Sequence, residues 1–454
     1  MSTMAWCATV DNCIPWSDAI LRSSIANTER VGNAFSDDLA NTAFIPGLGQ
    51  IKIEELTLSA NTPLVDVKSS NTRRRDLPAL TGLRFVAALL VFFTHVSKPQ
   101  NPGNPNLAAP FRDDGLVKVL GDNGFRLGIV AVSCFFLLSG FVITWSAKPG
   151  DRLTSFWRRR VVKVFPSHVV TWALCMLLFA GVFTTNHGIL NLFFIDTWFT
   201  DPSFWGGANG PAWSLNGEML FYAVFPFMLI PIKRIPENKL WLWAGILAAM
   251  LVAATVISRS VLPDTPPWQN VSIPQFWFVY FFPPMRLFEF AIGMIVARIV
   301  LSGRWPRIPL SLVGVVAVGG LVLTLVVPYP YNIALVTLVP IALTIGSLAS
   351  ANLSGNRTFL GTRPMVWLGK VSFGFFMAQA VVVFAIRPAV FGDAEYGTVG
   401  GILLILALFV MNLACGWLLY KFVELPAMKH WSRPRKRVLD SAPRADEPDK
   451  VPAL

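Results

Sequence analysis

The sequence predicts an all-α protein, a polytopic transmembrane helix bundle of about ten spans with both termini in the cytoplasm. Hydrophobic residues make up 54% of its 454 positions and charged residues only 14%, whereas soluble domains carry about 25% charged residues. The chain holds 35 phenylalanines and 16 tryptophans, and aromatic residues collect at membrane interfaces. Uncharged runs of roughly 20 residues recur, each long enough to cross a bilayer. This composition excludes a soluble enzyme and a wholly disordered chain.

The chain divides into three parts by composition. Residues 1–75 are polar, and we expect a disordered cytoplasmic tail or a translation start placed too early. Residues 76–426 form the membrane domain, and 427–454 form a basic tail that we expect to be disordered. The apolar tract 189–199 is too short to span and contains Asp196, so we interpret it as re-entrant or interfacial. The ten predicted spans are 79–97, 128–146, 164–184, 212–232, 240–260, 276–299, 308–327, 332–351, 365–387 and 398–420.

The distribution of lysine and arginine predicts the orientation. With the N-terminus in the cytoplasm, the internal loops hold 15 basic residues and the external loops hold 6, as the positive-inside rule expects. The net charge of +12 is therefore assigned to anionic lipid headgroups and not to nucleic acid. The five cysteines show no metal-binding spacing, so we expect no metal. These patterns predict a multi-pass protein of the cell membrane.

Ionisable residues inside spans are expensive and are functional candidates by default. Arg84 and His95 lie 11 residues apart in the first span, which places them on one helix face about 16 Å apart along the axis. Arg84 is then near the cytoplasmic end and His95 near the outer end. Alternatively, His95 is only a polar residue at a helix end.

Two further spans carry charge. Glu218 enters from the outer side, so we expect it at the depth of His95, where a carboxylate would orient the imidazole as a general base. Alternatively, Glu218 is a structural partner for a backbone amide or an indole. Arg286 and Glu289 are spaced i, i+3 in the sixth span and can neutralise each other, so we favour a structural role for them.

A cytoplasmic run of cations precedes Pro166. Such a run can clamp phosphates, with arginine suited to bidentate contact, although it can also be an ordinary positive-inside anchor. If Arg84 points at the same ligand, the residues describe a path across the membrane that a long donor such as acyl-coenzyme A can enter. The run consists of Arg158, Arg159, Arg160 and Lys163.

Several motifs resemble those of the integral-membrane acyltransferase-3 family of bacterial O-acyltransferases, and they occur in family order over about residues 77–430. Leu77–His95 (LPALTGLRFVAALLVFFTH) resembles the first family helix and Gly128–Trp145 (GIVAVSCFFLLSGFVITW) the second. The remaining matches are Pro211–Tyr222 (PAWSLNGEMLFY), Pro284–Ala297 (PMRLFEFAIGMIVA) and Tyr420–Pro426 (YKFVELP).

The resemblance implies that Arg84, His95 and Glu218 take essential positions, with His95 as the leading catalytic candidate and Glu218 beside it. The family's Arg-x-x-Arg signature falls on Arg160 and Lys163. Lysine keeps the charge but loses the planar fork, so donor binding at that corner is expected to be weaker or shared with neighbouring arginines. Residues 140–174 look closest to actinobacterial members, which include enzymes that acylate macrolide antibiotics.

The implied activity is transfer of an acyl group, with acetyl as first choice, from acyl-coenzyme A to a hydroxyl of a carbohydrate or a glycosylated, macrolide-like acceptor. Arg84 and the cytoplasmic cations would bind the donor, and no permanently bound cofactor is implied. A transporter of glycans, lipids or drugs is the alternative, but the chain shows no inverted repeat, and a scaffold without chemistry leaves the aligned charges unexplained. Aromatic residues of the outer loops, Trp198, Trp205 and Trp213, could stack on a sugar ring.

Overall fold

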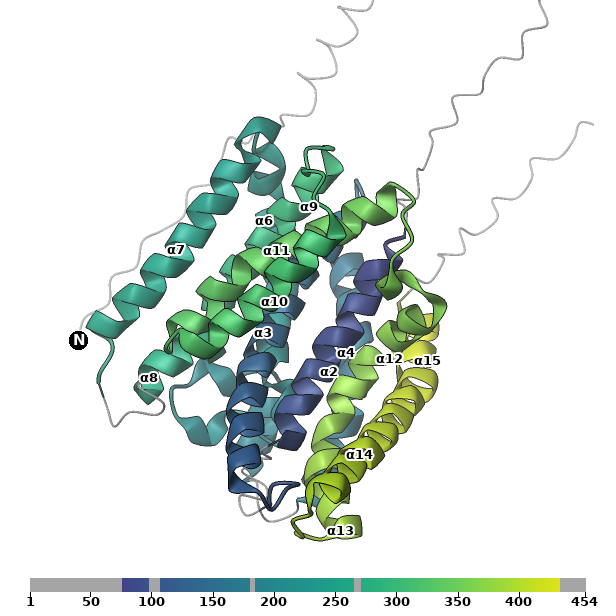
Figure 1. Cartoon of the computed structure of the whole chain (residues 1–454). Coiled ribbons are helices and arrows are strands. Elements are labelled where there is room, and N and C mark those ends of the chain that lie inside the picture. Colours follow the sequence, from purple (N-terminus) through teal and green to yellow (C-terminus); the bar gives the residue numbers. More distant parts are fainter. Residues whose placement is uncertain (1–75, 98–106, 180–183, 265–270, 433–454) are drawn as a thin grey trace, which may run out of the picture. The chain divides into compact units, whose positions relative to one another are not determined.

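The computed structural model describes residues 76–97, 107–179, 184–264 and 271–432, all of which lie in the unit Arg73–Leu454. Within these residues the structure is helical and contains no β-strand beyond one isolated bridge between Phe111 and Tyr396. This confirms the predicted all-α class (Figure 1). The tail predicted for residues 1–75 lies outside the described residues.

Most of the helices are long, and short 3₁₀ and π segments extend or connect them. The α-helices are α2 (Pro78–Ser97), α3 (Asp114–Ser146), α4 (Leu153–Leu178), α5 (Thr185–Leu192), α6 (Leu215–Arg234), α7 (Leu240–Val261), α8 (Ile273–Phe276), α9 (Pro283–Leu301), α10 (Leu310–Val326), α11 (Tyr331–Leu353), α12 (Arg363–Gln379), α13 (Arg387–Phe391), α14 (Thr398–Leu419) and α15 (Leu425–Trp431). The 3₁₀ segments are η1 (Asp196–Trp198), η2 (Pro202–Phe204), η3 (Gly210–Ser214), η4 (Glu237–Lys239) and η6 (Phe359–Gly361). The π-helices are η5 (Trp277–Phe281), η7 (Ala380–Ile386) and η8 (Tyr420–Glu424).

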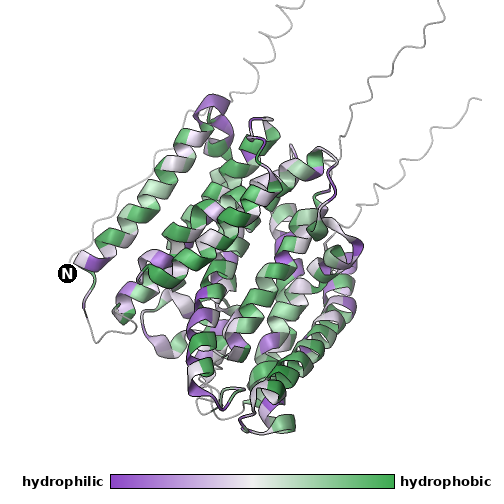
Figure 2. Cartoon of the chain, viewed as in Figure 1, coloured by the Kyte–Doolittle hydropathy of each residue, from purple (hydrophilic) through white to green (hydrophobic). Residues whose placement is uncertain are grey.

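Eight helical stretches of the described chain are long and apolar enough to cross a membrane. They contain α2, α3, α4, α6, α7, α11, α12 and α14. The other two predicted spans fall on α9 and α10, which are not among these eight stretches. Helix α10 has only 17 residues, and α9 carries the charged residues Arg286, Glu289 and Arg298. The count of ten spans and the cytoplasmic termini stay predictions. Figure 2 shows hydrophobic residues along the helices and hydrophilic ones mainly at their ends.

Three helices are longer than the hydropathy predicted, because hydropathy finds the apolar part of a helix and not its polar ends. Helix α3 begins at Asp114, and its N-terminus is capped by Asp113, which accepts a hydrogen bond from the Leu116 amide at 2.6 Å. Helix α4 begins at Leu153, so the basic run lies on its first turns. The last helix continues through η8 and α15 to Trp431, beyond residue 426 where we ended the domain.

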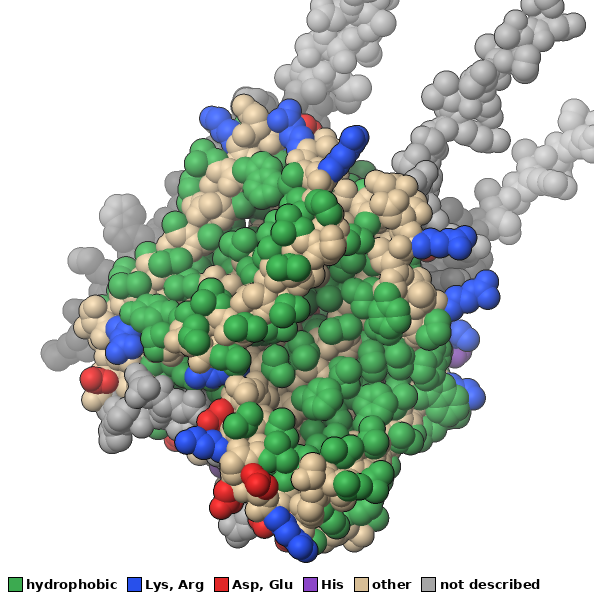
Figure 3. Space-filling view, in the orientation of Figure 1, with side chains coloured by type: hydrophobic (Ala, Val, Ile, Leu, Met, Phe, Trp, Pro, Cys, Tyr) green, Lys and Arg blue, Asp and Glu red, His purple; other side chains and the backbone are tan. Residues whose placement is uncertain are grey.

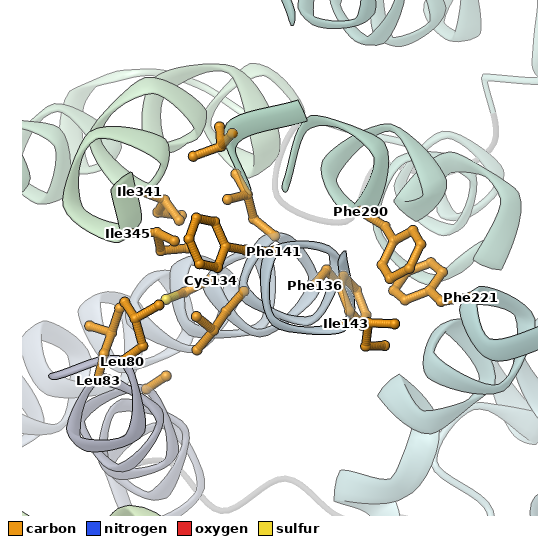
Figure 4. Close-up of a cluster of buried hydrophobic side chains, with 14 of the residues drawn as sticks. Leu80, Leu83, Cys134, Phe136, Phe141, Ile143, Phe221, Phe290, Ile341 and Ile345 are labelled. Atoms are coloured by element: carbon orange, nitrogen blue, oxygen red, sulfur yellow. The ribbon is translucent and has the colours of Figure 1, made fainter. Parts of the chain in front are cut away.

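The core is built around α3, whose most apolar stretch is 78% buried. Helices α3 and α9 cross at two glycines: a Cβ on Gly140 would lie 2.0 Å from the Phe290 carbonyl oxygen. Beside this crossing, Phe221 of α6 lies between Phe136 and Phe290, with ring centroids 5.1 and 4.6 Å apart (Figure 4). Small residues therefore let the backbones approach, as is usual between membrane helices.

The outer surface of the bundle is apolar, as a lipid-facing surface requires. The apolar stretch of α7 is only 17% buried, and that of α14 is 28% buried. In Figure 3 the middle of the visible face is mostly hydrophobic, Lys and Arg lie at its upper end and right side and also at its left and lower edges, and most acidic side chains lie near its lower end. The chain therefore forms a multi-pass membrane protein.

Candidate active site

Two cavities in the bundle contain most of the residues that the sequence singled out. The larger has a volume of about 860 Å³ and is lined by Arg84, Arg160, Lys163 and Glu218; we call it the basic cavity. The smaller has a volume of about 250 Å³ and is lined by His95; we call it the histidine cavity. Ligand sites typically have volumes of about 300 to 1,000 Å³, so the first can hold a large ligand and the second a small group.

Helix α2 supplies one ionisable residue to each cavity. Arg84 lines the basic cavity, and His95, three turns further along the same face, lines the histidine cavity. Both side chains therefore face protein cavities and not lipid, as the 11-residue spacing predicted.

Phe376 of α12 lines both cavities, so its side chain forms part of the wall between them. It is 6% exposed, and its ring meets that of Phe135 edge to face, with centroids 5.9 Å apart. Nothing in the sequence distinguished Phe376 from the other phenylalanines of α12. The two cavities thus share one aromatic wall residue.

The cations of the basic cavity come from three helices. Arg84 lies on α2, Arg160 and Lys163 on α4, and Lys370 on α12. Lys370 was counted only as a loop cation in the sequence, because the hydropathy pattern does not show that its helix turns this residue towards the other three.

The two halves of the Arg-x-x-Lys pair have different surroundings. The Lys163 ammonium lies 2.6 Å from the carboxylate of Glu424, which is 4% exposed. The guanidinium of Arg160 lies over the rings of Phe156 and Tyr222, at 5.4 and 6.0 Å from their centroids. Lys163 is therefore largely neutralised by a direct ion pair, whereas Arg160 lies against aromatic rings and interacts with the Glu218 carboxylate electrostatically.

The other two predicted phosphate ligands do not line the basic cavity. Arg159 forms an ion pair with Asp151 at the start of α4. Arg158 is half-buried on the same helix, and neither residue is among the lining side chains. The helical period explains the separation, since neighbouring residues of a helix point about 100° apart. Of the basic run, only Arg160 and Lys163 face Arg84.

The expected pairing of Glu218 with His95 is wrong. Glu218 lines the basic cavity and accepts a hydrogen bond from the Ser139 hydroxyl at 3.0 Å, and it interacts electrostatically with Arg84 and Arg160. His95 lines the other cavity, and its Nδ1 lies 2.6 Å from Oε1 of Gln379. Glu218 thus lies at the depth of Arg84 and not at that of His95.

The reason is the course of residues 184–214, which return into the bundle before α6 begins. Asn209, 0% exposed, donates to the Thr171 hydroxyl at 3.0 Å and to the Met377 carbonyl oxygen at 3.3 Å. Helix α6 begins at Leu215, shortly after this contact with the C-terminal end of α12, and its first turn reaches the basic cavity. We had placed the start of this span at residue 212, near the outer surface.

A buried carboxylate fixes this segment, which confirms that tract 189–199 does not span. Asp196 is 0% exposed and accepts hydrogen bonds from the amides of Asn191 and Asn216, at 2.9 and 2.6 Å. Burial raises the pKa of Asp196 to about 6. Asn216 also donates to the Trp213 carbonyl oxygen at 2.8 Å, so Asp196 ties the re-entrant segment to the start of α6.

Several aromatic side chains line the histidine cavity, together with Thr94, Asp122 and small or aliphatic residues. Trp213 lies against Tyr280 and Phe281, with ring centroids 4.8 and 4.5 Å apart, and all three line the cavity. Of the outer-loop tryptophans suggested for sugar stacking, Trp213 alone lines this cavity. Trp205 packs against Phe281, with ring centroids 4.6 Å apart.

The intramembrane pair of the sixth span is structural. The Arg286 guanidinium lies 2.7 Å from the Glu289 carboxylate, and each side chain is 1% exposed. Arg286 also donates to the Ser133 hydroxyl at 2.9 Å and to the Val279 carbonyl oxygen at 3.1 Å. Neither residue lines either cavity, so the pair joins α3 to α9.

Comparisons with known proteins show which family and which proteins this chain is similar to. A model of the family described as "Acyltransferase domain", acyltransferase-3, matches residues 77–421. Acyltransferase MdmB of Streptomyces mycarofaciens is 35% identical over 392 residues, which cover 83% of this chain and 97% of that protein. Peptidoglycan O-acetyltransferase OatA of Listeria monocytogenes is 21% identical over 80% of this chain and 57% of its own length. Exopolysaccharide production protein ExoZ of Rhizobium meliloti is 29% identical over 50% of this chain and 68% of its own length. No solved structure matches the chain.

The family model covers most of the described membrane domain, and MdmB matches along nearly its whole length. These matches decide between an enzyme and a transporter, which the charges alone left open. The chain belongs to the integral-membrane acyltransferase-3 family and is a multi-pass acyltransferase of groups other than amino-acyl groups.

Proposed function

We propose that the protein transfers an acyl group, with acetyl as first choice, from acyl-coenzyme A to a hydroxyl of a carbohydrate or a glycosylated, macrolide-like acceptor. The observation that carries the proposal is the pair of cavities, with four cations in the wall of one, a histidine in the wall of the other and Phe376 in the wall of both. The relative named as a peptidoglycan O-acetyltransferase supports the hydroxyl of a sugar polymer as acceptor.

The donor would occupy the basic cavity. Phosphates of coenzyme A need charge-assisted hydrogen bonds, which arginine gives in bidentate form. Arg160 and Arg84 are the cations best placed for this, with Lys370 beside them. The thioester end would then reach past Phe376 towards His95.

His95 would act as the general base. Its free ring nitrogen removes the proton of the acceptor hydroxyl while that oxygen attacks the thioester carbon, and the coenzyme A thiolate leaves and takes up a proton. A covalent acyl-His95 intermediate is the other route to the same products.

The position of Glu218 changes the role we propose for it. Beside Ser139 and near Arg84 and Arg160, it belongs to the donor side of the site and not to His95. We therefore expect Glu218→Gln to change the donor KM more than kcat, whereas an orienting acid would act mainly on the chemical step.

The experiment is release of free coenzyme A thiol from acetyl-coenzyme A by the purified protein in detergent, with and without a panel of hydroxylated sugars and glycosides. We expect acceptor-dependent thiol release that His95→Ala lowers at least about a hundredfold, since general-base catalysis contributes that much. Gel filtration of the variant shows whether it is folded. Residual activity above about a tenth of wild type in folded His95→Ala would contradict the role of His95, and no thiol release with any acyl donor would overturn the proposed reaction.

A further inference from the structure

We propose that Gln379 is the positioning residue of His95: it holds the imidazole in the tautomer whose Nε2 can accept a proton. This inference rests on the proposed function. Gln379 ends α12, is 0% exposed, and faces α2 through two hydrogen bonds. Sequence reasoning assigned the orienting role to Glu218, which lies in the other cavity.

The two hydrogen bonds of Gln379 fix which way its amide points. Its Nε2 donates to the Ala88 carbonyl oxygen at 3.4 Å, and its Oε1 lies 2.6 Å from His95 Nδ1. The reverse orientation would place Oε1 against the carbonyl oxygen of Ala88, so that two acceptors would face each other. The hydrogen-bond network therefore decides the orientation, which is the sound way to assign an amide.

The tautomer of His95 follows from this orientation. An oxygen at 2.6 Å can only accept, so Nδ1 of His95 must carry the hydrogen and donate it. In the neutral imidazole the other nitrogen, Nε2, then holds the lone pair. Nε2 is the nitrogen left for a substrate in the histidine cavity, as a general base or a nucleophile requires.

Local structure explains how one glutamine reaches both partners on α2. Ala88 and His95 are two turns apart, but carbonyl oxygens point towards the C-terminus of a helix and side chains tilt towards its N-terminus, so the two groups approach each other. Directly after Gln379 the helix widens into the π-helix η7. Phe384 of η7 meets the His95 ring edge to face, with centroids 5.6 Å apart. Wide turns of this kind often occur at functional sites.

The test compares the activity of two variants of Gln379. A positioning role and a packing role predict opposite orders for their activities. Gln379→Leu has a similar volume but accepts no hydrogen bond, so we expect kcat to fall at least about tenfold with the acceptor and donor KM within about twofold. Loss of the hydrogen-bond partner that orients a metal-bound histidine typically costs about ten- to a hundredfold, and we expect an effect of the same order for His95, the proposed base. Gln379→Glu keeps an acceptor for Nδ1–H, so we expect it to retain more activity than Gln379→Leu.

Asn412 provides the matched control. It is also a 0% exposed amide, and it donates to the Phe375 carbonyl oxygen of α12 at 2.8 Å, but it lines neither cavity. Asn412→Leu should lower thermal stability and leave kcat within about twofold of wild type. If Gln379 only packs, Gln379→Leu behaves like this control and Gln379→Glu, a buried carboxylate, is the more damaging change.

Each result separates this inference from the proposed function. An inactive wild type overturns the proposed function. An active wild type with an inactive His95→Ala and a normal kcat in Gln379→Leu overturns the positioning role alone. If positioning is correct, Gln379→Leu causes no further loss in the His95→Ala background, because a residue that acts through another has no effect without it.

Discussion

Removing the guanidinium of Arg160 should weaken binding of coenzyme A and leave acceptor binding unchanged. Arg160 faces the basic cavity, where its guanidinium lies over two aromatic rings and interacts electrostatically with the Glu218 carboxylate. A hydrogen bond to a charged group contributes about 1.5 to 3 kcal/mol, which corresponds to a factor of about 10 to 150 in the dissociation constant. Because Arg84 and Lys370 line the same cavity, they can partly replace the lost contact, and we expect the lower part of this range in Arg160→Ala.

Isothermal titration of the detergent-solubilised protein with coenzyme A measures this change directly, without the complication that KM also contains the chemical step. Arg158→Ala is the matched control, since it removes the same charge from the same turns of α4 at a residue that does not line the cavity. We expect Arg158→Ala to bind within about twofold of wild type. Equal binding by wild type and a correctly inserted Arg160→Ala would refute the reasoning, because it would make the whole run a positive-inside anchor. An equal loss of coenzyme A affinity in Arg160→Ala and Arg158→Ala would show that the summed positive charge of the run attracts coenzyme A, and not a direct contact with Arg160.

Three further predictions concern the wall between the cavities, the helix crossing and the buried carboxylate. Phe376→Ala should raise the ratio of kcat/KM for butyryl- over acetyl-coenzyme A, because it removes a ring that lines both cavities; an unchanged ratio would show that the acyl group does not pass this residue. Gly293→Ala should lower the unfolding free energy by about 1 to 3 kcal/mol, since the new Cβ would lie 2.0 Å from a carbonyl oxygen of α3. In the control variant Gly245→Ala the new Cβ has no atom within 4 Å, so this variant should melt in detergent at or above the wild-type temperature. Burial raises the pKa of Asp196 to about 6, above about 3.9 for an unfolded chain, so between these values the native state holds a proton that the unfolded chain has released. The folded protein therefore loses stability as pH rises from about 4 to 6. The melting temperature should fall less over this pH range in Asp196→Asn than in the wild type.

The fold was predictable where the chain meets lipid. A lipid-facing helix must be apolar over some 20 residues, so hydropathy alone located the helical segments. It misplaced their ends, because capping and polar turns decide where a helix stops: Asp113 caps α3 well before the apolar run begins. The structural pairing of Arg286 with Glu289 was predictable too, since i, i+3 neighbours share one face of a helix.

The site was only partly predictable, because a single helix has a known period while contacts between helices depend on packing. Arg84 and His95 lie on one helix, and their common face followed from 3.6 residues per turn. Lys370 and Gln379 lie on α12 and reach α2 only through the way the two helices pack. No pattern in one sequence contains that information, although Gln379 is the one side-chain amide in the predicted span 365–387, and polar residues within spans are functional candidates.

The misplacement of Glu218 follows from one assumption about the segment before α6. Hydropathy treats a loop between two spans as lying outside the membrane, because backbone groups in lipid must be satisfied. Here buried side chains satisfy part of the backbone: Asn191 Oδ1 accepts from the Asn209 backbone amide at 3.3 Å, and the Trp172 indole donates to the Gly188 carbonyl oxygen at 2.8 Å. Helix α6 consequently begins near the middle of the bundle and delivers its carboxylate to the donor cavity. A re-entrant loop therefore changes the depth of every residue in the helix that follows it, and the role of Glu218 changes with that depth from orienting the base to shaping the donor site.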